Sequence, residues 1–219
     1  MRPIPSQKLE LFPKDAHPYG LTYEEWTIKW WTWLLEIPTK NSPAYDWTGT
    51  NAYINQSDPH VFFLCQTYDK NGIVPFRSVM IQEGKSLFFP LINWISIAPE
   101  DGNTEDDLLL KAKNKMNTIG NLILDINGQQ ITNGLEQYRV QSHPFHVNLP
   151  SDNILKTDQG IRKVVSDGYW ILTKRLTSPV QLRTFGSCTA GTMNLGVKYD
   201  ITILTGKKSG KLASKLIES

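Results

Sequence analysis

The sequence has few of the features that mark several large classes of protein. Cysteine occurs only at Cys65 and Cys188, and two cysteines so far apart form neither a zinc-binding spacing nor the disulfide framework of a small secreted domain. The sequence leaves open whether these two are bonded to each other. No apolar run approaches the roughly 18 residues that a membrane-spanning helix requires. Charged residues make up 20% and hydrophobic residues 40% of the 219-residue chain, which excludes a disordered or collagen-like protein.

Charge of one sign is also scarce. The formal net charge is +2, and residues 207–219, with four Lys and one Glu, contribute +3 of it, which leaves −1 for residues 1–206. A nearly neutral body lacks the electrostatic footprint of a nucleic-acid-binding protein, so we expect no nucleic-acid partner. Without repeats or a low-complexity linker, the chain is predicted to form one domain over residues 1–206, followed by a basic, flexible tail at 207–219.

The first residues lack the apolar stretch of 7–15 residues that defines a secretory signal peptide. As the chain is written, we therefore expect a cytoplasmic protein with reduced cysteines. A chain from which a native signal had been removed would instead be secreted.

The clearest local pattern predicts a helix over residues 22–37. Thr22 and Glu25 have the spacing of a capping box, in which each side chain accepts a hydrogen bond from the backbone of the other. Tryptophans then recur every three or four residues from Trp26 to Trp33 on one face, and Pro38 ends the pattern. A second helix is expected from Thr104 to about Asn117, because acidic residues begin it and lysines end it.

Most of the remaining chain has the pattern of short strands. Residues 60–68 and 73–81 read as a hairpin around a turn at 69–72, and Pro90 suggests an edge or a bulge in the run 87–97. Many short strands without βαβ spacing predict a mainly β fold, namely an antiparallel β-sandwich of jelly-roll type with a Trp-rich N-terminal helix and one inserted helix. The other strand candidates are 121–126 with 129–132, 137–141, 145–149, 169–176, 180–185 and 195–204.

Several blocks of sequence resemble a family of uncharacterised bacterial and archaeal proteins. The most specific is the EWxxxWWxW block that begins at Glu25. The resemblance covers roughly residues 19–204, and it implies an architecture but no assigned activity and no cofactor. The further blocks are Asp46–Gly49 (DxTG), Gln56 with Val61–Leu64, Gly84–Asn93 (GKxLFFPxxN), Tyr138–Ser142 and Asp167–Trp170 (DGYW).

Two carboxylates beside the tryptophans are candidate catalytic residues. Glu25 and Asp46, with Arg77 as a cationic partner, would form a general acid/base pair of the kind that acts on a glycosidic bond. The structural alternative is strong, because Glu25 suits the capping box and Asp46 suits an Asx turn. Arg77, Arg139 and Arg183 are each predicted in mid-strand, where a buried guanidinium needs a carboxylate such as Glu25 or Asp46, or an anionic ligand.

Four residues form the predicted ligand-binding set: Trp31, Trp47, Gln56 and Asn93. Seven tryptophans are many for this length, and they form either a core or a platform for a sugar or an apolar ligand. Trp31 lies off the main helical face and Trp47 lies in a predicted loop, so these two are expected to be exposed. Gln56 and Asn93 belong to the blocks described above.

Two further patterns are weaker. His143 and His146 are three residues apart, but Pro144 argues against the helix that would put both on one face, and we predict no metal site. Cys188 lies in a Gly-flanked turn without the spacing of a nucleophile elbow.

The sequence thus favours a non-catalytic binding or structural β-domain for a glycan or small polar ligand near Trp31, Trp47 and Asp46. One alternative is a hydrolase or lyase that uses the Glu25–Asp46 pair. The other is a self-associating protein whose exposed aromatic residues form a homo-oligomer interface.

Overall fold

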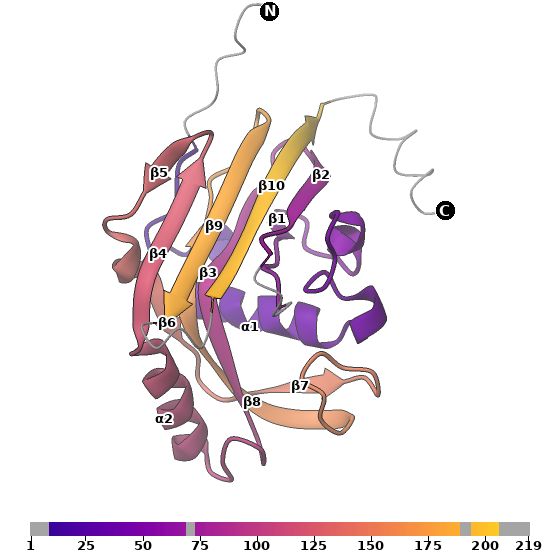
Figure 1. Ribbon diagram of the computed structural model, residues 1–219, viewed down its shortest axis with the longest axis vertical. Coiled ribbons are helices and arrows are strands. Elements are labelled where there is room, and N and C mark those ends of the chain that lie inside the picture. The colour runs from indigo at the N-terminus through magenta and orange to yellow at the C-terminus, as the bar shows by residue number, and fades with distance from the viewer. Residues whose placement is uncertain (1–8, 69–72, 189–193, 206–219) are drawn as a thin grey trace, which may run out of the picture.

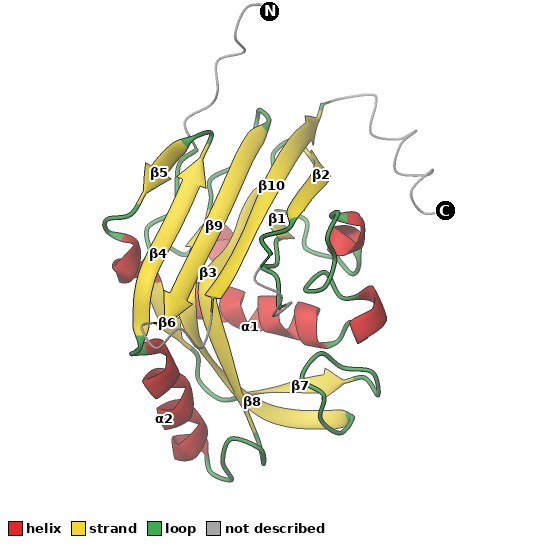
Figure 2. Cartoon of the chain, in the orientation of Figure 1, coloured by secondary structure: helices red, strands yellow, loops and turns green. Residues whose placement is uncertain are grey.

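The fold is mainly β, with two sheets and two α-helices (Figures 1 and 2). The computed structural model describes residues 9–68, 73–188 and 194–205, so the predicted turn at 69–72 and the tail at 207–219 lie outside the described residues. Two facing sheets are consistent with a β-sandwich. The predicted jelly-roll connectivity and the extent of the domain, 1–206, stay predictions.

Each sheet has five strands. The first sheet has the order β1 (Val61–Phe63), β3 (Ser86–Ile97), β8 (Gly160–Leu172) and β6 (Arg139–Gln141), and β7 (Phe145–Leu149) pairs with the first part of β8. The second has the order β2 (Phe76–Gln82), β10 (Asn194–Leu204), β9 (Val180–Cys188), β4 (Ile119–Ile126) and β5 (Gln129–Ile131).

The sheets are mixed, so the prediction of a purely antiparallel fold is wrong. β1 pairs with β3 in parallel, and β2 pairs with β10 in parallel. The predicted hairpin between residues 60–68 and 73–81 is also wrong, because its two strands lie in different sheets. The reason is the segment 65–67, which is buried and takes the chain from the first sheet toward the second, where Cys65 contacts Arg77 of β2 and Tyr199 of β10.

Helix α1 (Tyr23–Leu35) confirms the first predicted helix and its cap. The Thr22 hydroxyl accepts from the Glu25 backbone N–H at 3.1 Å, and the Glu25 carboxylate accepts from the Thr22 N–H at 2.7 Å. The helix lies against the first sheet, where it contacts β3, β6, β7 and β8. Pro38 follows its end as the N-cap of the 3-10 segment Thr39–Asn41, and the described residues contain three further such segments, Pro18–Gly20, Thr50–Tyr53 and Leu135–Tyr138.

Helix α2 (Glu105–Met116) confirms the second predicted helix, with Thr104 as its N-cap. It buries a narrow face, chiefly Leu108 and Ala112, against Val165 of β8. It therefore covers one end of the first sheet (Figure 2). Its charged residues remain on the side exposed to water. No helix in the described ranges is long and apolar enough to cross a bilayer.

Two further local predictions are confirmed. β4 and β5 form a hairpin, and Asn127 (φ 53°) and Gly128 (φ 81°) supply the two positive φ angles of its tight turn. The register of β3 against β8 shifts between Pro90 and Ile92, which is the bulge that Pro90 suggested. β3 is an interior strand, however, between β1 and β8.

The core lies between the two sheets and under α1. A Cβ at Gly186 of β9 would lie 2.5 Å from the Leu91 carbonyl of β3, so the sheets approach closely there and only glycine fits. Under α1, Trp170 of β8 stacks on Phe88 of β3 with ring centroids 5.3 Å apart. We call the buried rings around this pair the aromatic centre; its members are Trp26, Trp30, Trp31, Trp33, Phe63, Phe88 and Trp170.

Candidate functional site

A cleft of about 370 Å³ lies where the last turn of α2 meets both sheets. Its walls come from α2, β4, β6 and β8 and from the segment between β5 and β6, so it forms only when the two sheets come together. We call it the Arg139 cleft. Its apolar lining is Met116, Ile119 and Leu122, and its polar lining is Asn117, Thr132, Glu136, Arg139 and Tyr169, with Gly120 completing the wall.

Arg139 is held in one position by four hydrogen bonds. Its Nε and Nη2 donate to the two carboxylate oxygens of Asp167 at 3.1 and 2.8 Å, a bidentate pair. Its Nη1 donates to the Asn117 side chain at 2.8 Å, and its Nη2 also donates to the Lys113 carbonyl at 3.1 Å. Arg139 thereby ties the C-terminal end of α2 to the sheet, as a second donor to the Lys113 carbonyl, which also accepts from the Asn117 N–H.

Strand pairing explains how Arg139 reaches Asp167. Arg139 lies opposite Tyr169 in the β6–β8 ladder, and Asp167 lies opposite Gln141, two positions further along. Diagonal neighbours of this kind are within reach of a long side chain. The YRVQS and SDGYW blocks, separate in sequence, are therefore paired strands that together build the cleft floor.

The electrostatics of the cleft are nearly balanced. The Asp167 side chain is only 1% exposed, and burial raises the pKa of its carboxyl above the ordinary value although Arg139 opposes the shift. Burial also raises the pKa of Tyr169, so its hydroxyl is protonated at neutral pH. Arg139 and Asp167 neutralise each other, which leaves Glu136 as the one uncompensated charge of the cleft lining.

The predicted catalytic residues have structural partners of their own. Glu25 caps α1, and its two hydrogen bonds from Thr22 lower the pKa of its carboxyl. Burial alone would raise the pKa of Asp46, but backbone N–H donors from Thr48 and Asn51 outweigh it and hold this pKa below the ordinary value. Neither carboxylate lines the three cavities that we describe in the resolved part of the fold.

Arg77 lies in the interior, 1% exposed, and contacts Asp46 only through the main chain. Its Nε donates to the Asp46 carbonyl at 2.7 Å and its Nη1 to the Tyr199 hydroxyl at 2.8 Å. The structure thus brings Asp46 and Arg77 together, but the Asp46 carboxylate is directed to its own loop. The suggested pairing of Arg139 with Glu25 or Asp46 is wrong, because its partner is Asp167.

The predicted ligand-binding residues are dispersed. Trp31 is 1% exposed and its Nε1 donates to the Ser166 hydroxyl, so the expectation that it is exposed is wrong: α1 is apolar on nearly every side and is covered by β6, β7 and β8. Trp47 is 40% exposed, as expected. Gln56 bonds both the N–H and the carbonyl of Phe63, and buried Asn93 accepts from the Tyr68 hydroxyl at 2.8 Å.

The cysteine and histidine patterns have local explanations. Cys65 is a free thiol buried between the sheets, and desolvation raises its pKa to about 12. It borders a gap too small for a water molecule, together with Gln66, Thr184 and Tyr199. His143 Nδ1 lies 2.7 Å from a Glu24 carboxylate oxygen, and the residues that the structure describes contain no group of three potential metal ligands. The turn after Cys188 lies outside the described residues.

Sequence reasoning missed Thr132 and Glu136, which are ordinary turn residues without a motif. It singled out Arg139 and the DGYW block separately. A buried Asp and a mid-strand Arg each need a partner of opposite charge, and this rule could have paired Arg139 with Asp167. A scan against protein-family models finds no match, and neither the curated proteins nor the solved structures give a significant one.

Proposed function

We propose that this protein is a non-catalytic binding domain and that the Arg139 cleft holds a small neutral polar ligand of the size of one sugar ring. The observation that carries the proposal is the fixed guanidinium of Arg139 on the floor of a 370 Å³ cleft. A site whose polar groups are held in place before binding loses little entropy when the ligand enters.

The charge balance favours a neutral ligand over an anion. Asp167 already compensates Arg139, so an anion would gain little attraction and would meet the negative charge of Glu136. Hydroxyl groups suit this lining better. Glu136 accepts hydrogen bonds, Thr132 and Tyr169 each both donate and accept, and the apolar residues Met116 and Leu122 can contact the C–H face of a ring.

The position of the acidic groups supports binding rather than catalysis. A general acid or base must come within hydrogen-bond reach of the substrate. Asp167, whose raised pKa would suit such a role, lies behind Arg139 with both oxygens occupied and 1% of its side chain exposed. Glu136 is then the single carboxylate in the lining, without the second one that glycoside hydrolysis ordinarily uses.

Isothermal titration calorimetry with glucose, galactose, N-acetylglucosamine and glycerol tests the proposal. We expect at least one of them to bind, and Glu136→Gln and Thr132→Val each to weaken that binding by about tenfold, the loss of one good hydrogen bond. Trp47→Ala is the matched control on another surface and should bind as the parent does. If no sugar or polyol binds, or if the cleft variants bind unchanged, the proposal fails.

Self-association is the second candidate, because two large exposed apolar side chains lie on segments that are hydrogen-bonded to each other. Trp47 is 40% and Phe76 58% exposed, and the two segments are joined by the hydrogen bond from the Ser78 N–H to the Thr48 carbonyl. Sedimentation velocity over a hundredfold range of concentration tests it: a dimer that is lost in Trp47→Ala/Phe76→Ala supports self-association, and a monomer throughout eliminates it.

The hydrolase or lyase hypothesis stays a weaker proposal. Glu25 caps α1 and Asp46 accepts hydrogen bonds from its own loop, so a structural role explains the presence of both carboxylates. Turnover of an aryl glycoside that Glu25→Gln abolishes, in a variant that stays folded, would favour it over the binding domain.

A further inference from the structure

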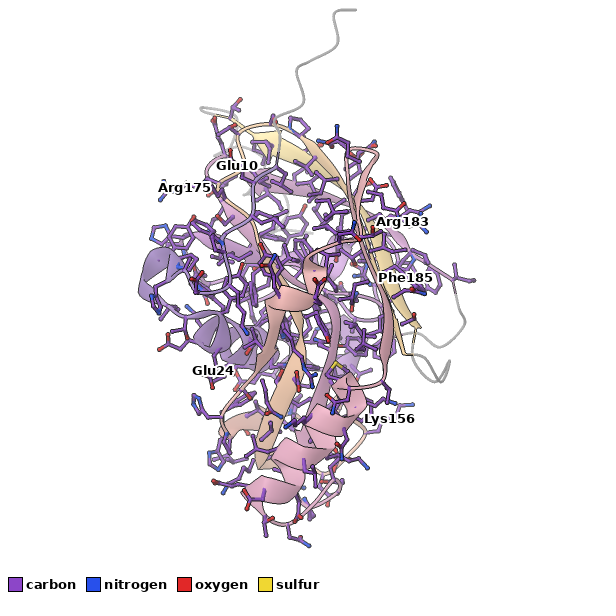
Figure 3. All side chains as sticks on the ribbon, turned by 90° about the vertical axis from the view of Figure 1, so that its left-hand side faces the viewer. Glu10, Glu24, Lys156, Arg175, Arg183 and Phe185 are labelled. Atoms are coloured by element: carbon purple, nitrogen blue, oxygen red, sulfur yellow. The ribbon has the colours of Figure 1, made fainter. Side chains whose placement is uncertain are left out.

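A second hollow, of about 440 Å³, lies at another part of the molecule and shares no residue with the Arg139 cleft. It forms where the N-terminal segment runs beside the chain that leaves β8, since Leu11 bridges to Thr173 and the Lys174 N–H donates to the Glu10 carbonyl. Figure 3 shows Glu10 and Arg175 next to each other at this place. We call it the Tyr19 hollow; it is lined by Glu10, Phe12, Tyr19, Lys174 and Arg175.

Tyr19 has a strained backbone that the surrounding contacts hold in place. Its φ of 58° and ψ of 26° lie in the left-handed region, which a bulky residue rarely occupies and which costs on the order of 1–3 kcal/mol. Its ring stacks on His60 at 4.7 Å and meets Phe12 and Trp26 edge-on at 6.2 and 6.4 Å, and its hydroxyl lies 2.7 Å from the Ser86 hydroxyl. Strain of this kind concentrates at binding sites.

The charged side chains that line the Tyr19 hollow carry a net positive charge. Lys174 pairs with Glu10 at 2.6 Å, and the Arg175 guanidinium lies over the Tyr19 ring, 5.7 Å from its centroid. Two cations against one carboxylate give the lining a net charge of +1. The Lys174 and Glu10 side chains are 51% and 59% exposed, so their ion pair is weak and a competing anion can replace Glu10.

We propose that the Tyr19 hollow binds a small organic anion with an aromatic ring. Its carboxylate or phosphate group would displace Glu10 from Lys174 and meet Arg175, which lies over Tyr19, while its ring lies against Phe12. Glu10 is then a built-in competitor that lowers the affinity of the site. This inference does not depend on the proposed function, since it concerns a different cavity and an anionic ligand in place of a neutral one.

Titration calorimetry with benzoate, acetate, benzyl alcohol and phenyl phosphate tests the inference. Benzoate should bind. Acetate, which lacks the aromatic ring, and benzyl alcohol, which lacks the negative charge, should each bind at least about tenfold more weakly. Lys174→Gln and Arg175→Gln should each weaken benzoate by about tenfold, and Glu10→Gln should strengthen it by about threefold because Lys174 loses its competitor. Raising the salt from 50 to 500 mM should weaken the wild-type complex.

Glu105→Gln removes the carboxylate of another exposed Lys–Glu pair, with Lys163 at 2.7 Å; it is the matched control and should leave benzoate binding unchanged. Thermal melts of every variant establish that the fold is retained. Phenyl phosphate that binds tighter or weaker than benzoate supports the proposal either way and names the head group. Absence of binding by both anions, benzyl alcohol as tight as benzoate, or a Glu10→Gln variant that binds no tighter would each overturn it. Because neutral sugars test the Arg139 cleft, the two proposals fail separately.

Discussion

The aromatic centre and the Arg139 cleft are built from opposite kinds of sequence. The aromatic centre collects the most conspicuous residues of the chain, and Trp30, Trp31 and Trp170 are all at most 1% exposed. The Arg139 cleft is lined by residues that no motif marks, such as Thr132 and Glu136. Large rings stabilise the core because each removes much apolar surface from water. The many tryptophans of the sequence therefore marked the hydrophobic core and not the candidate binding site.

The second difference lies in how the polar atoms are used. In the aromatic centre, indole N–H groups donate to partners inside the fold: Trp30 donates to the Leu64 carbonyl at 2.9 Å, and Trp31 donates to the Ser166 hydroxyl at 2.7 Å. In the cleft the internal bonds hold Arg139 in place, while Glu136 and Thr132 in the lining have polar atoms left to meet a ligand. The comparison makes four predictions.

The largest effect is expected at the aromatic centre. Trp30 is fully buried and touches Trp31, Trp33 and Trp170, so Trp30→Ala should destabilise the protein by about 4 kcal/mol through the cavity it leaves. Urea denaturation monitored by circular dichroism measures this. A loss below about 1 kcal/mol would mean that the aromatic centre is not the scaffold we describe.

Arg139→Gln should cost about 3 kcal/mol at neutral pH, because it leaves the buried Asp167 carboxylate without its partner. Without Arg139 the raised pKa of Asp167 rises further, so the variant binds a proton to higher pH than the wild type. The deficit should therefore shrink as the pH falls and the carboxyl becomes neutral in both proteins. Denaturation at pH 4 and pH 7 checks the sign, and a deficit that grows toward acid would contradict the pairing.

Asp46→Asn should cost about 1–2 kcal/mol, since the carboxylate accepts from the Thr48 and Asn51 N–H groups and the amide replaces it poorly. The pKa of Asp46 is lowered in the fold, so its contribution is complete above its pKa in the unfolded chain, about 3.9, and is lost as the pH falls through the folded value. In the wild type, protonation of Asp46 therefore destabilises the fold, whereas protonation of Asp167, whose pKa is raised, stabilises it. Melting curves between pH 2.5 and 7 should show the difference between wild type and Asp46→Asn vanish toward acid.

The smallest effect is expected at Trp47. Because its ring is 40% exposed and lies outside the aromatic centre, Trp47→Ala should change stability by no more than about 0.5 kcal/mol. Its sugar binding should equal that of the wild type. A large loss of sugar affinity with an unchanged melting temperature would move the site from the Arg139 cleft to the loop that carries Trp47 and Asp46.

Local features were predictable wherever neighbouring residues carry the signal. The cap of α1 needs only Thr22 and Glu25, and the β4–β5 turn needs only Asn127 and Gly128, since each forms from residues within one turn of chain. For the same reason the Asx-type loop of Asp46 was visible as a structural alternative.

The partners of Arg139 and the burial of Trp31 were not predictable in this way. Asp167 is 28 residues from Arg139, and Ser166 is 135 residues from Trp31. Each contact exists because strands pair across the first sheet or because α1 lies on it, and the residues near each position in the chain do not specify that partner.

The sequence by itself determined the two helices, the residues of the tight turn between β4 and β5, and the mainly β character of the fold. Hydrophobic periodicity, helix caps and β-propensity each act over a few neighbouring residues. Only the tertiary structure decided that β1 and β2 lie in different sheets with parallel partners, that the tryptophans are interior, and that Arg139 and Tyr19 each line a cavity. These features depend on which distant surfaces bury each other, and that free energy belongs to the packed molecule and not to any segment of it.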